Sequence, residues 1–213
     1  MKTTILLAAM TMMTSSIVAF PQEPALTGSC TVPEDVVESF LPESIDSGLK
    51  SVLLPVDYGR MVNCREWVSD VLATVTTHSY GYDEKSGVEK LLNEKTYPVT
   101  PADMVGSWRV RSIQIEARDG IFSYPYFRCR FRYVDGKVFF EKTTGSQRKS
   151  GFVYQNGPKS LAFLGGWSVN DEPQTSYGAE NSVAGVLYKI GTRRAIILFP
   201  TSADRVEIYE LIK

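Results

Sequence analysis

The sequence predicts a mainly β protein: a small antiparallel barrel of about eight strands, preceded by a short helical N-terminal segment. Three observations predict this fold class. Apolar residues and arginines alternate at 127–133, two Asp-Gly dipeptides divide the stretch around them, and eight short strand-like segments follow Gly106. Such alternation is the period of a half-buried strand. Eight short antiparallel strands suffice to close a sheet into a small barrel, which removes its edges.

The two Asp-Gly dipeptides predict the pairing of the central strands. A type I′ turn needs positive φ at both central residues, and Asp-Gly tolerates this. The partners predicted from Asp135-Gly136 are Arg132 with Phe139 and Arg130 with Glu141. The partners predicted from Asp119-Gly120 are Val110 with Cys129, Arg109 with Arg130 and Arg111 with Arg128. Both turns place the arginines at 109, 111, 128, 130 and 132 on one face, which we call the arginine stripe.

The other strands are predicted from apolar runs between turn signals, with Asn156-Gly157 and 190–194 as further hairpin turns. The predicted strands are 108–116, 124–134, 137–143, 151–155, 160–164, 183–190, 195–199 and 206–212. Gly106-Ser-Trp108 is similar to the opening strand of lipocalins, so the barrel is expected to be lipocalin-like. The segment 165–181 is predicted as a long loop beside the barrel, and loops of that length often serve function.

The segment before the barrel contains the predicted helices. Apolar residues recur at helical spacing over 57–77, with Asp57 as the N-cap, and 86–93 is expected to form a second helix capped by Ser86. The X-Pro steps in 97–101 predict an extended linker. His78, the only histidine, is expected to be exposed at the end of the first helix rather than to act as a base.

Residues 1–19 have the pattern of a secretory signal peptide, with Lys2 as the only charge before a short apolar run. We predict cleavage after Ala19 and a periplasmic or secreted protein with no membrane span, because a spanning helix needs about 20 apolar residues. The predicted organisation is therefore a signal peptide at 1–19, a turn-rich and helical lead segment at 20–105, and the barrel at 106–213.

Charge argues against nucleic acid and anionic membranes as general partners, because removal of Lys2 takes the net charge of −1 to only −2. The lead segment carries six Lys and Arg against fourteen Asp and Glu, whereas the barrel carries sixteen against ten. The acidic lead segment either covers the arginine stripe or packs elsewhere, and we favour the second arrangement. The expected state is a monomer.

The three cysteines, Cys30, Cys64 and Cys129, predict one disulfide and one free thiol in an exported chain, and their spacing leaves the pairing open. No residue pattern fits a zinc site. We therefore predict neither a metal nor a cofactor.

Several pieces of the chain resemble, in order, domain of unknown function family 4893, a family of exported bacterial proteins with no established activity. These pieces are YFRCR at 126–130, KTTGSQRKSG at 142–151, LAFLG at 161–165, YG at 177–178, GV at 185–186 and VEIYEL at 206–211. The helix around Trp67 looks like a divergent form of the family's lead segment. The resemblance covers roughly three quarters of the chain and implies no mechanism.

The resemblance bears on the cysteines. Family members tend to have a cysteine where this chain has Val110, which the predicted register places opposite Cys129. The resemblance thus implies that Cys129 is a buried free thiol that behaves as a small hydrophobic residue. Cys30 and Cys64 are then left to form the disulfide.

Two groups of residues are candidate binding sites. The turn formed by Gly145, Ser146, Gln147 and Arg148 offers a hydroxyl, an amide and a guanidinium for a carboxylate or phosphate. Alternatively, these groups satisfy buried turn backbone and a nearby acid. On the arginine stripe, Arg109, Arg128 and Arg130 either bind an external anion or form a solvated face relieved by Glu141, since like charges that face each other are destabilising.

The preferred function is a non-catalytic binding module for an anionic small molecule or a protein partner. The alternative is a periplasmic enzyme with a polar site at Ser146, Gln147 and Arg148. Binding is favoured because nucleophilic or metal catalysis needs a base or ligands that one terminal histidine and one buried cysteine hardly supply. An open barrel interior lined by polar groups favours a ligand, whereas a filled interior favours a partner.

Overall fold

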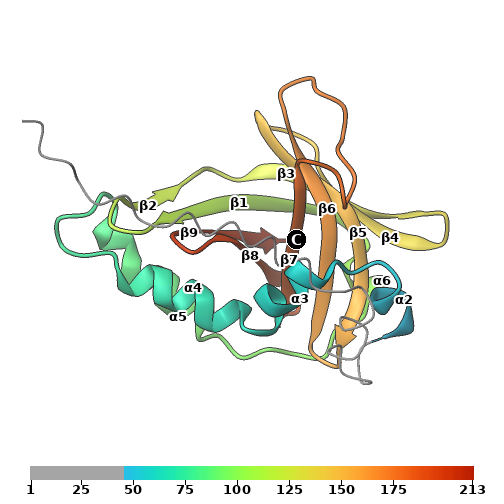
Figure 1. Cartoon of the computed structure of the whole chain (residues 1–213), viewed down its shortest axis with the longest axis horizontal. Coiled ribbons are helices and arrows are strands. Elements are labelled where there is room, and N and C mark those ends of the chain that lie inside the picture. Colours follow the sequence, from blue (N-terminus) through green and yellow to red (C-terminus); the bar gives the residue numbers. More distant parts are fainter. Residues whose placement is uncertain (1–45) are drawn as a thin grey trace, which may run out of the picture. The chain divides into compact units, whose positions relative to one another are not determined.

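A computed structural model describes residues 46–213, which fall within one compact unit. Nine strands form one antiparallel sheet in the order β2-β1-β3-β4-β5-β6-β7-β8-β9, and β1 also pairs with β9. The second pairing closes eight strands into a barrel and leaves β2 as an extra strand beside β1 (Figure 1). The predicted fold class is confirmed. The strands are β1 Gly106–Glu116, β2 Gly120–Ser123, β3 Phe127–Val134, β4 Lys137–Lys142, β5 Gln147–Gly157, β6 Ser160–Val169, β7 Ser182–Gly191, β8 Arg194–Ser202 and β9 Arg205–Ile212.

Short helices precede the barrel, with bounds that differ from the prediction. The predicted helix 57–77 is two helices that meet at Asn63, whose φ of −98° and ψ of 19° lie outside the helical range. The first begins at Pro55, because proline fits the first turn of a helix. The helices are α2 Ser47–Lys50, α3 Pro55–Val62, α4 Cys64–Ala73, the 3-10 helix η2 Tyr82–Glu84, α5 Lys85–Leu92 and α6 Pro101–Met104. Among the described residues, no helix is long and apolar enough to cross a membrane.

The Asp135-Gly136 hairpin is confirmed. Both residues have positive φ, 48° and 75°, and Val134 pairs with Lys137 across the turn. The register that follows places Arg132 opposite Phe139 and Arg130 opposite Glu141, as predicted.

The register predicted from Asp119-Gly120 is wrong by two residues. Glu116 pairs with Gly120, so the loop has three residues, and β2 is inserted before β3. The observed partners are Trp108 with Cys129, Arg109 with Arg128, and Arg111 with Glu210 of β9. Because a shift of two keeps the side-chain parity, each residue still faces the predicted side of the sheet.

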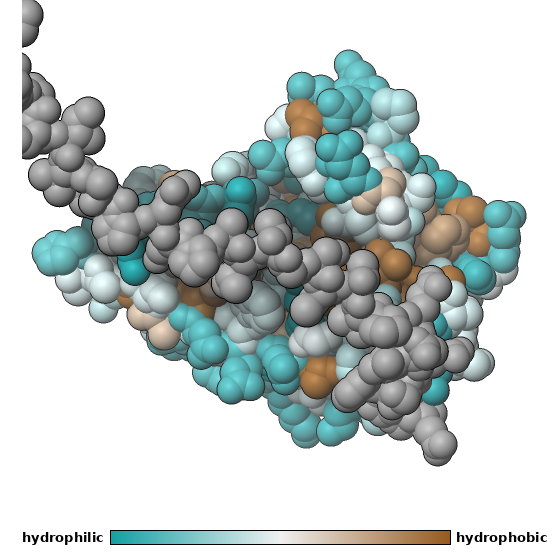
Figure 2. Space-filling view, in the orientation of Figure 1, coloured by the Kyte–Doolittle hydropathy of each residue, from teal (hydrophilic) through white to brown (hydrophobic). Residues whose placement is uncertain are grey.

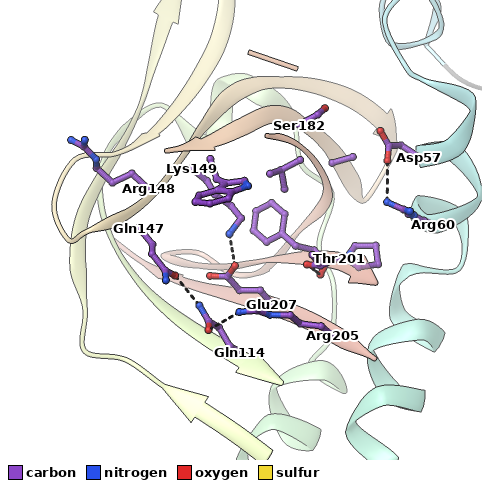
Figure 3. A pocket seen from close by; sticks show the side chains of 15 residues that line it. Asp57, Arg60, Gln114, Gln147, Arg148, Lys149, Ser182, Thr201, Arg205 and Glu207 are labelled. Carbon is purple, nitrogen blue, oxygen red and sulfur yellow. Dashed lines mark hydrogen bonds and ion pairs between the residues drawn. The ribbon is translucent and has the colours of Figure 1, made fainter. Parts of the chain in front are cut away.

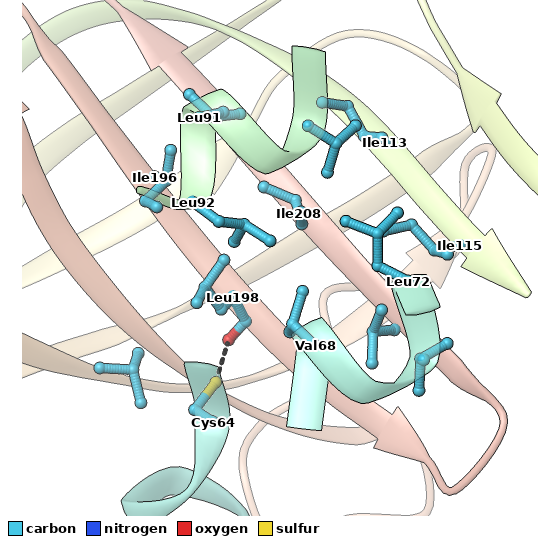
Figure 4. Close-up of a cluster of buried hydrophobic side chains, with 14 of the residues drawn as sticks. Cys64, Val68, Leu72, Leu91, Leu92, Ile113, Ile115, Ile196, Leu198 and Ile208 are labelled. Carbon is cyan, nitrogen blue, oxygen red and sulfur yellow. Dashed lines mark hydrogen bonds between the residues drawn. The ribbon is translucent and has the colours of Figure 1, made fainter. Parts of the chain in front are cut away.

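The barrel wall separates two hydrophobic cores. Outside the wall, α4 and α5 pack against β1, β8 and β9, and residues such as Val68, Leu72 and Ile208 fill the space between them (Figure 4). Inside the wall, four aromatic residues form a closed ring in which the centroids of neighbouring rings lie 5.2–6.3 Å apart. We call Phe140, Phe163, Phe199 and Tyr209 the aromatic layer.

Cys129 is a buried free thiol, as predicted. Cys64 is also buried and has no disulfide partner among residues 46–213, so the predicted disulfide stays a prediction. Its Sγ donates a hydrogen bond to the Leu198 carbonyl at 3.5 Å, in the core between α4 and the barrel (Figure 4). Cys30, the other half of the predicted pair, lies outside the described residues.

Both described thiols are expected to resist a thiol reagent until the protein unfolds. Burial raises the pKa of Cys64 to about 12 and also raises that of Cys129, so thiolate is scarce at pH 8. In a Cys30→Ser variant, a dithiobenzoate assay should count no thiol in the native protein and two after unfolding. Fast reaction of the native variant would contradict the buried positions. A single thiol in the unfolded, unreduced wild type would instead establish a disulfide.

Candidate functional site

A cavity of about 340 Å³ opens at one end of the barrel. Its lining comes from β1 and from β5 to β9, at the strand ends that meet there, and α3 contributes one edge (Figure 3). Phe199 of the aromatic layer belongs to the lining, so the layer forms part of the cavity wall. The barrel interior is therefore neither wholly filled nor wholly open.

A buried ion pair lies on the polar side of the cavity. The Lys149 ammonium binds Oε2 of Glu207, and Ser112 Oγ donates to Oε1 at 2.5 Å (Figure 3). Both side chains of the pair are 12% exposed. Burial alone would raise the pKa of Glu207, but the Lys149 charge and the Ser112 hydrogen bond hold that pKa below its usual value. The carboxylate is therefore ionised at neutral pH.

A second buried lysine, Lys142, lies near this pair. Its Nζ donates to the Gln147 carbonyl at 2.7 Å, and no carboxylate of residues 46–213 is within ion-pair distance. Burial lowers the pKa of Lys142 to about 8; the Glu207 carboxylate opposes this lowering and the Lys149 charge adds to it. Lys142, Lys149 and Glu207, the interior cluster, thus carry one excess positive charge at pH 7.

A chain of hydrogen bonds orients the amides of the cavity. Arg205 Nη2 donates to Gln114 Oε1 at 3.4 Å, and Gln114 Nε2 donates to Gln147 Oε1 at 3.1 Å (Figure 3). A guanidinium only donates, so it fixes which end of the Gln114 amide faces it. The Gln147 amide nitrogen is thereby left as a donor for a ligand.

The structure does not bring the predicted turn residues together. Gln147 and Arg148 are the first two residues of β5, and successive strand side chains point to opposite faces. Gln147 faces the cavity, whereas Arg148 borders it but points away (Figure 3). Ser146 is exposed in the turn before β5, where its carbonyl accepts a hydrogen bond from Asn170 N.

The arginine stripe lies on the outer face of the barrel, and two carboxylates neutralise most of it. Glu141 accepts hydrogen bonds from Arg130 at 2.6 Å and from Arg132 at 2.8 Å. Glu210, 6% exposed, accepts from Arg111 at 2.6 Å and binds Arg194 at 3.3 Å. For these arginines the ion pairs agree with the second predicted alternative, a solvated face whose charge repulsion Glu141 relieves.

Arg109 and Arg128 are the exception within the stripe. They face each other across β1 and β3, both are exposed, and no carboxylate among residues 46–213 forms an ion pair with either. The Arg109 guanidinium lies 5.7 Å from the centre of the Tyr126 ring. Of the predicted stripe residues, these two remain available to an external anion, on the opposite side of the wall from the cavity.

A family model described as Domain of unknown function (DUF4893) matches residues 50–211. The chain belongs to this family. No curated protein matches the chain. Among solved structures, that of a redesigned beta barrel is similar at 15% identity with a TM-score of 0.39, covering 56% of this chain and 98% of that chain. The DUF4893 match includes the whole interior cluster.

The interior cluster of this DUF4893 barrel is not among the candidate sites predicted from the sequence. The alternation of inward and outward residues along β4 and β9 nevertheless indicates it. Lys142 follows Val138 and Phe140 at the inward positions of β4, and Glu207 precedes Tyr209 at the inward positions of β9. A charged residue at an inward position is rare unless it is paired or functional.

A second, apolar groove of about 470 Å³ lies on the outer face of the barrel. Hydrophobic residues reach the surface over β4 and β5 (Figure 2), where Phe139 and Phe152 pack edge to face. The described residues that line this groove include no charged side chain. It therefore lacks the charged groups that line the cavity.

Replacing Lys142 with Met is expected to stabilise the protein by about 1–3 kcal/mol at pH 7, because a buried ammonium without a carboxylate partner is costly. The folded pKa of about 8 is below the unfolded value. Between these values the unfolded chain binds more protons, so wild-type stability rises with pH through this window and the advantage of the variant disappears near pH 10.5. Urea unfolding at several pH values measures this effect, with exposed Lys159→Met as control. Equal stability of Lys142→Met and wild type at pH 7 would contradict it.

Glu141→Gln is expected to lower the free energy of unfolding by about 1–2 kcal/mol, a value reduced by the exposure of its two arginine partners. Burial would raise the pKa of Glu141, but Arg132 and Arg130 hold it below the usual glutamate value, so this contribution is present at neutral pH and is lost as the pH falls through that lowered pKa. Arg128→Gln should change stability by less than about 0.5 kcal/mol. Thermal melts at pH 7 and pH 3 compare the variants; a large loss for Arg128→Gln would show that a further acid contacts this residue.

Proposed function

We propose that this DUF4893 protein is an exported, monomeric and non-catalytic binding protein whose barrel takes up a small anionic ligand in the cavity. One observation carries the proposal: more cationic than acidic side chains line the cavity. The cationic residues are Arg60, Arg148, Lys149 and Arg205, and the acidic residues are Asp57 and Glu207. An anionic ligand supplies negative charge to this lining. Export rests on residues 1–19, which lie outside the described residues.

The hydrogen-bonding character of the cavity supports an anion. Gln147, Lys149 and Arg205 present N–H donors in its lining, whereas the Glu207 carboxylate already accepts from Lys149 and Ser112. Donors of this kind, two of them charged, form their strongest hydrogen bonds with anionic acceptors. The volume of the cavity lies at the lower end of the range for small-molecule sites.

The described residues favour binding over catalysis. In the site of the alternative enzyme, Gln147 and Arg148 point in different directions (Figure 3), and Ser146 is exposed and does not line the cavity. His78 and the two described thiols do not line the cavity. Lys142 has a pKa suited to proton transfer, but it is also absent from the lining. If the partner is a protein instead of a small ligand, Arg109 and Arg128 form an exposed site that is smaller than the cavity site.

Removal of the ion pair should weaken anion binding. The double variant Lys149→Met/Glu207→Gln removes both charges of the pair, so neither residue is left without its partner, and the variant is expected to stay folded. Isothermal titration with acetate, benzoate, succinate and inorganic phosphate should detect at least one ligand for the wild type and a loss of affinity of about 10- to 100-fold in the variant.

Exposed Lys159→Met serves as the matched control and should bind as the wild type does. Two results would refute the proposal: no binding of any of the four anions to the folded wild type, or equal binding to the folded double variant.

A further inference from the structure

We propose that the ligand is a small aromatic monocarboxylate, an inference that rests on the proposed function. Its negative charge follows from the cavity lining, which has four cationic side chains and two carboxylates. A monocarboxylate brings a single negative charge to Lys149. A phosphate dianion would place two negative charges beside the buried Glu207 carboxylate, which is unfavourable for both anions.

The donors of β5 fit a carboxylate group. Gln147 and Lys149 lie two residues apart on the same strand, so both side chains face the cavity. Their amide and ammonium groups offer one donor for each carboxylate oxygen. The Lys149 ammonium is held in place, 4.9 Å from the ring centre of Phe199 and 5.0 Å from that of Tyr209.

The cavity volume limits the ligand to about one ring with a short acidic arm. A dry cavity of about 150 Å³ accommodates benzene. The cavity here is about 340 Å³ and includes space beside polar groups. This comparison indicates a ligand of roughly ten non-hydrogen atoms.

An aromatic wall stands beside the charged end of the cavity. Trp167 is directly opposite Lys149 in the pairing of β5 with β6, and both line the cavity. Trp167 is 39% exposed, whereas Phe199 in the same lining is almost completely buried. An indole in this position offers a ring face to a ligand whose carboxylate reaches Lys149, and aromatic contacts add roughly three- to tenfold in affinity beyond the buried area.

Four ligands of similar size test the charge and the ring separately. Phenylacetate is the probe, phenylacetamide removes the charge, cyclohexylacetate removes the aromaticity, and phenyl phosphate replaces the monoanion with a dianion. Titration calorimetry at pH 7.5 and constant ionic strength should show phenylacetate binding at least tenfold more tightly than phenylacetamide. It should also bind at least threefold more tightly than cyclohexylacetate and than phenyl phosphate.

Trp167→Leu should bring the affinities of phenylacetate and cyclohexylacetate together, while Tyr133→Leu, at an exposed aromatic residue outside the cavity, should leave their ratio unchanged. Unchanged preference in Trp167→Leu would overturn the inference. The inference would also be overturned if cyclohexylacetate or phenyl phosphate bound as tightly as phenylacetate. If that binding depended on Lys149, the proposed function would still stand. The same holds if acetate or inorganic phosphate binds and none of the four probes does. If no anion binds at all, both fail.

Discussion

The pairing of β1 with β9 is the constraint on which the rest of the structure depends. It runs from Arg109 opposite Ile212 to Glu116 opposite Arg205, and it turns an open sheet into a closed barrel. Closure removes the sheet edges and gives every strand residue a definite side, inside or outside. An eight-stranded barrel is just wide enough for side chains to fill. The few charged residues at inward positions therefore determine the chemical character of the barrel interior.

Charged side chains on the inner and outer faces of the barrel wall have different partners. Outside, Glu141 and Glu210 each accept two arginines that remain partly exposed to water, so each of these arginines has a carboxylate partner and the pairs contribute modest stability. Inside, Lys149 and Glu207 balance each other, and Lys142 has only a carbonyl and ring faces as neighbours. Well-packed apolar residues in place of such buried charges are often neutral or stabilising. Stability alone thus gives no reason for the interior cluster.

The sequence predicts the architecture well because the alternation and the hairpin turns act locally. Asp135-Gly136 is a two-residue turn, which leaves one register possible, and that register is observed. Around Asp119 the loop, residues 117–119, is one residue longer and the chain then forms β2, which no local signal separates from a simple hairpin. The site is harder to predict. Gln147 begins a strand instead of ending a turn. Lys149 and Glu207 are 58 residues apart in sequence, and their meeting depends on the closure between β1 and β9.

The aromatic layer connects these features. Phe140, Phe163, Phe199 and Tyr209 contact one another around the barrel and leave the polar end open above them. Two of the four rings also flank the Lys149 ammonium. The residues that fill the barrel therefore fix the position of its charge before any ligand arrives. A charge held in place in this way loses little entropy when it meets a counter-charge, and its burial weakens screening by solvent. In this way the packing that stabilises the fold also fixes the Lys149 charge at the cavity.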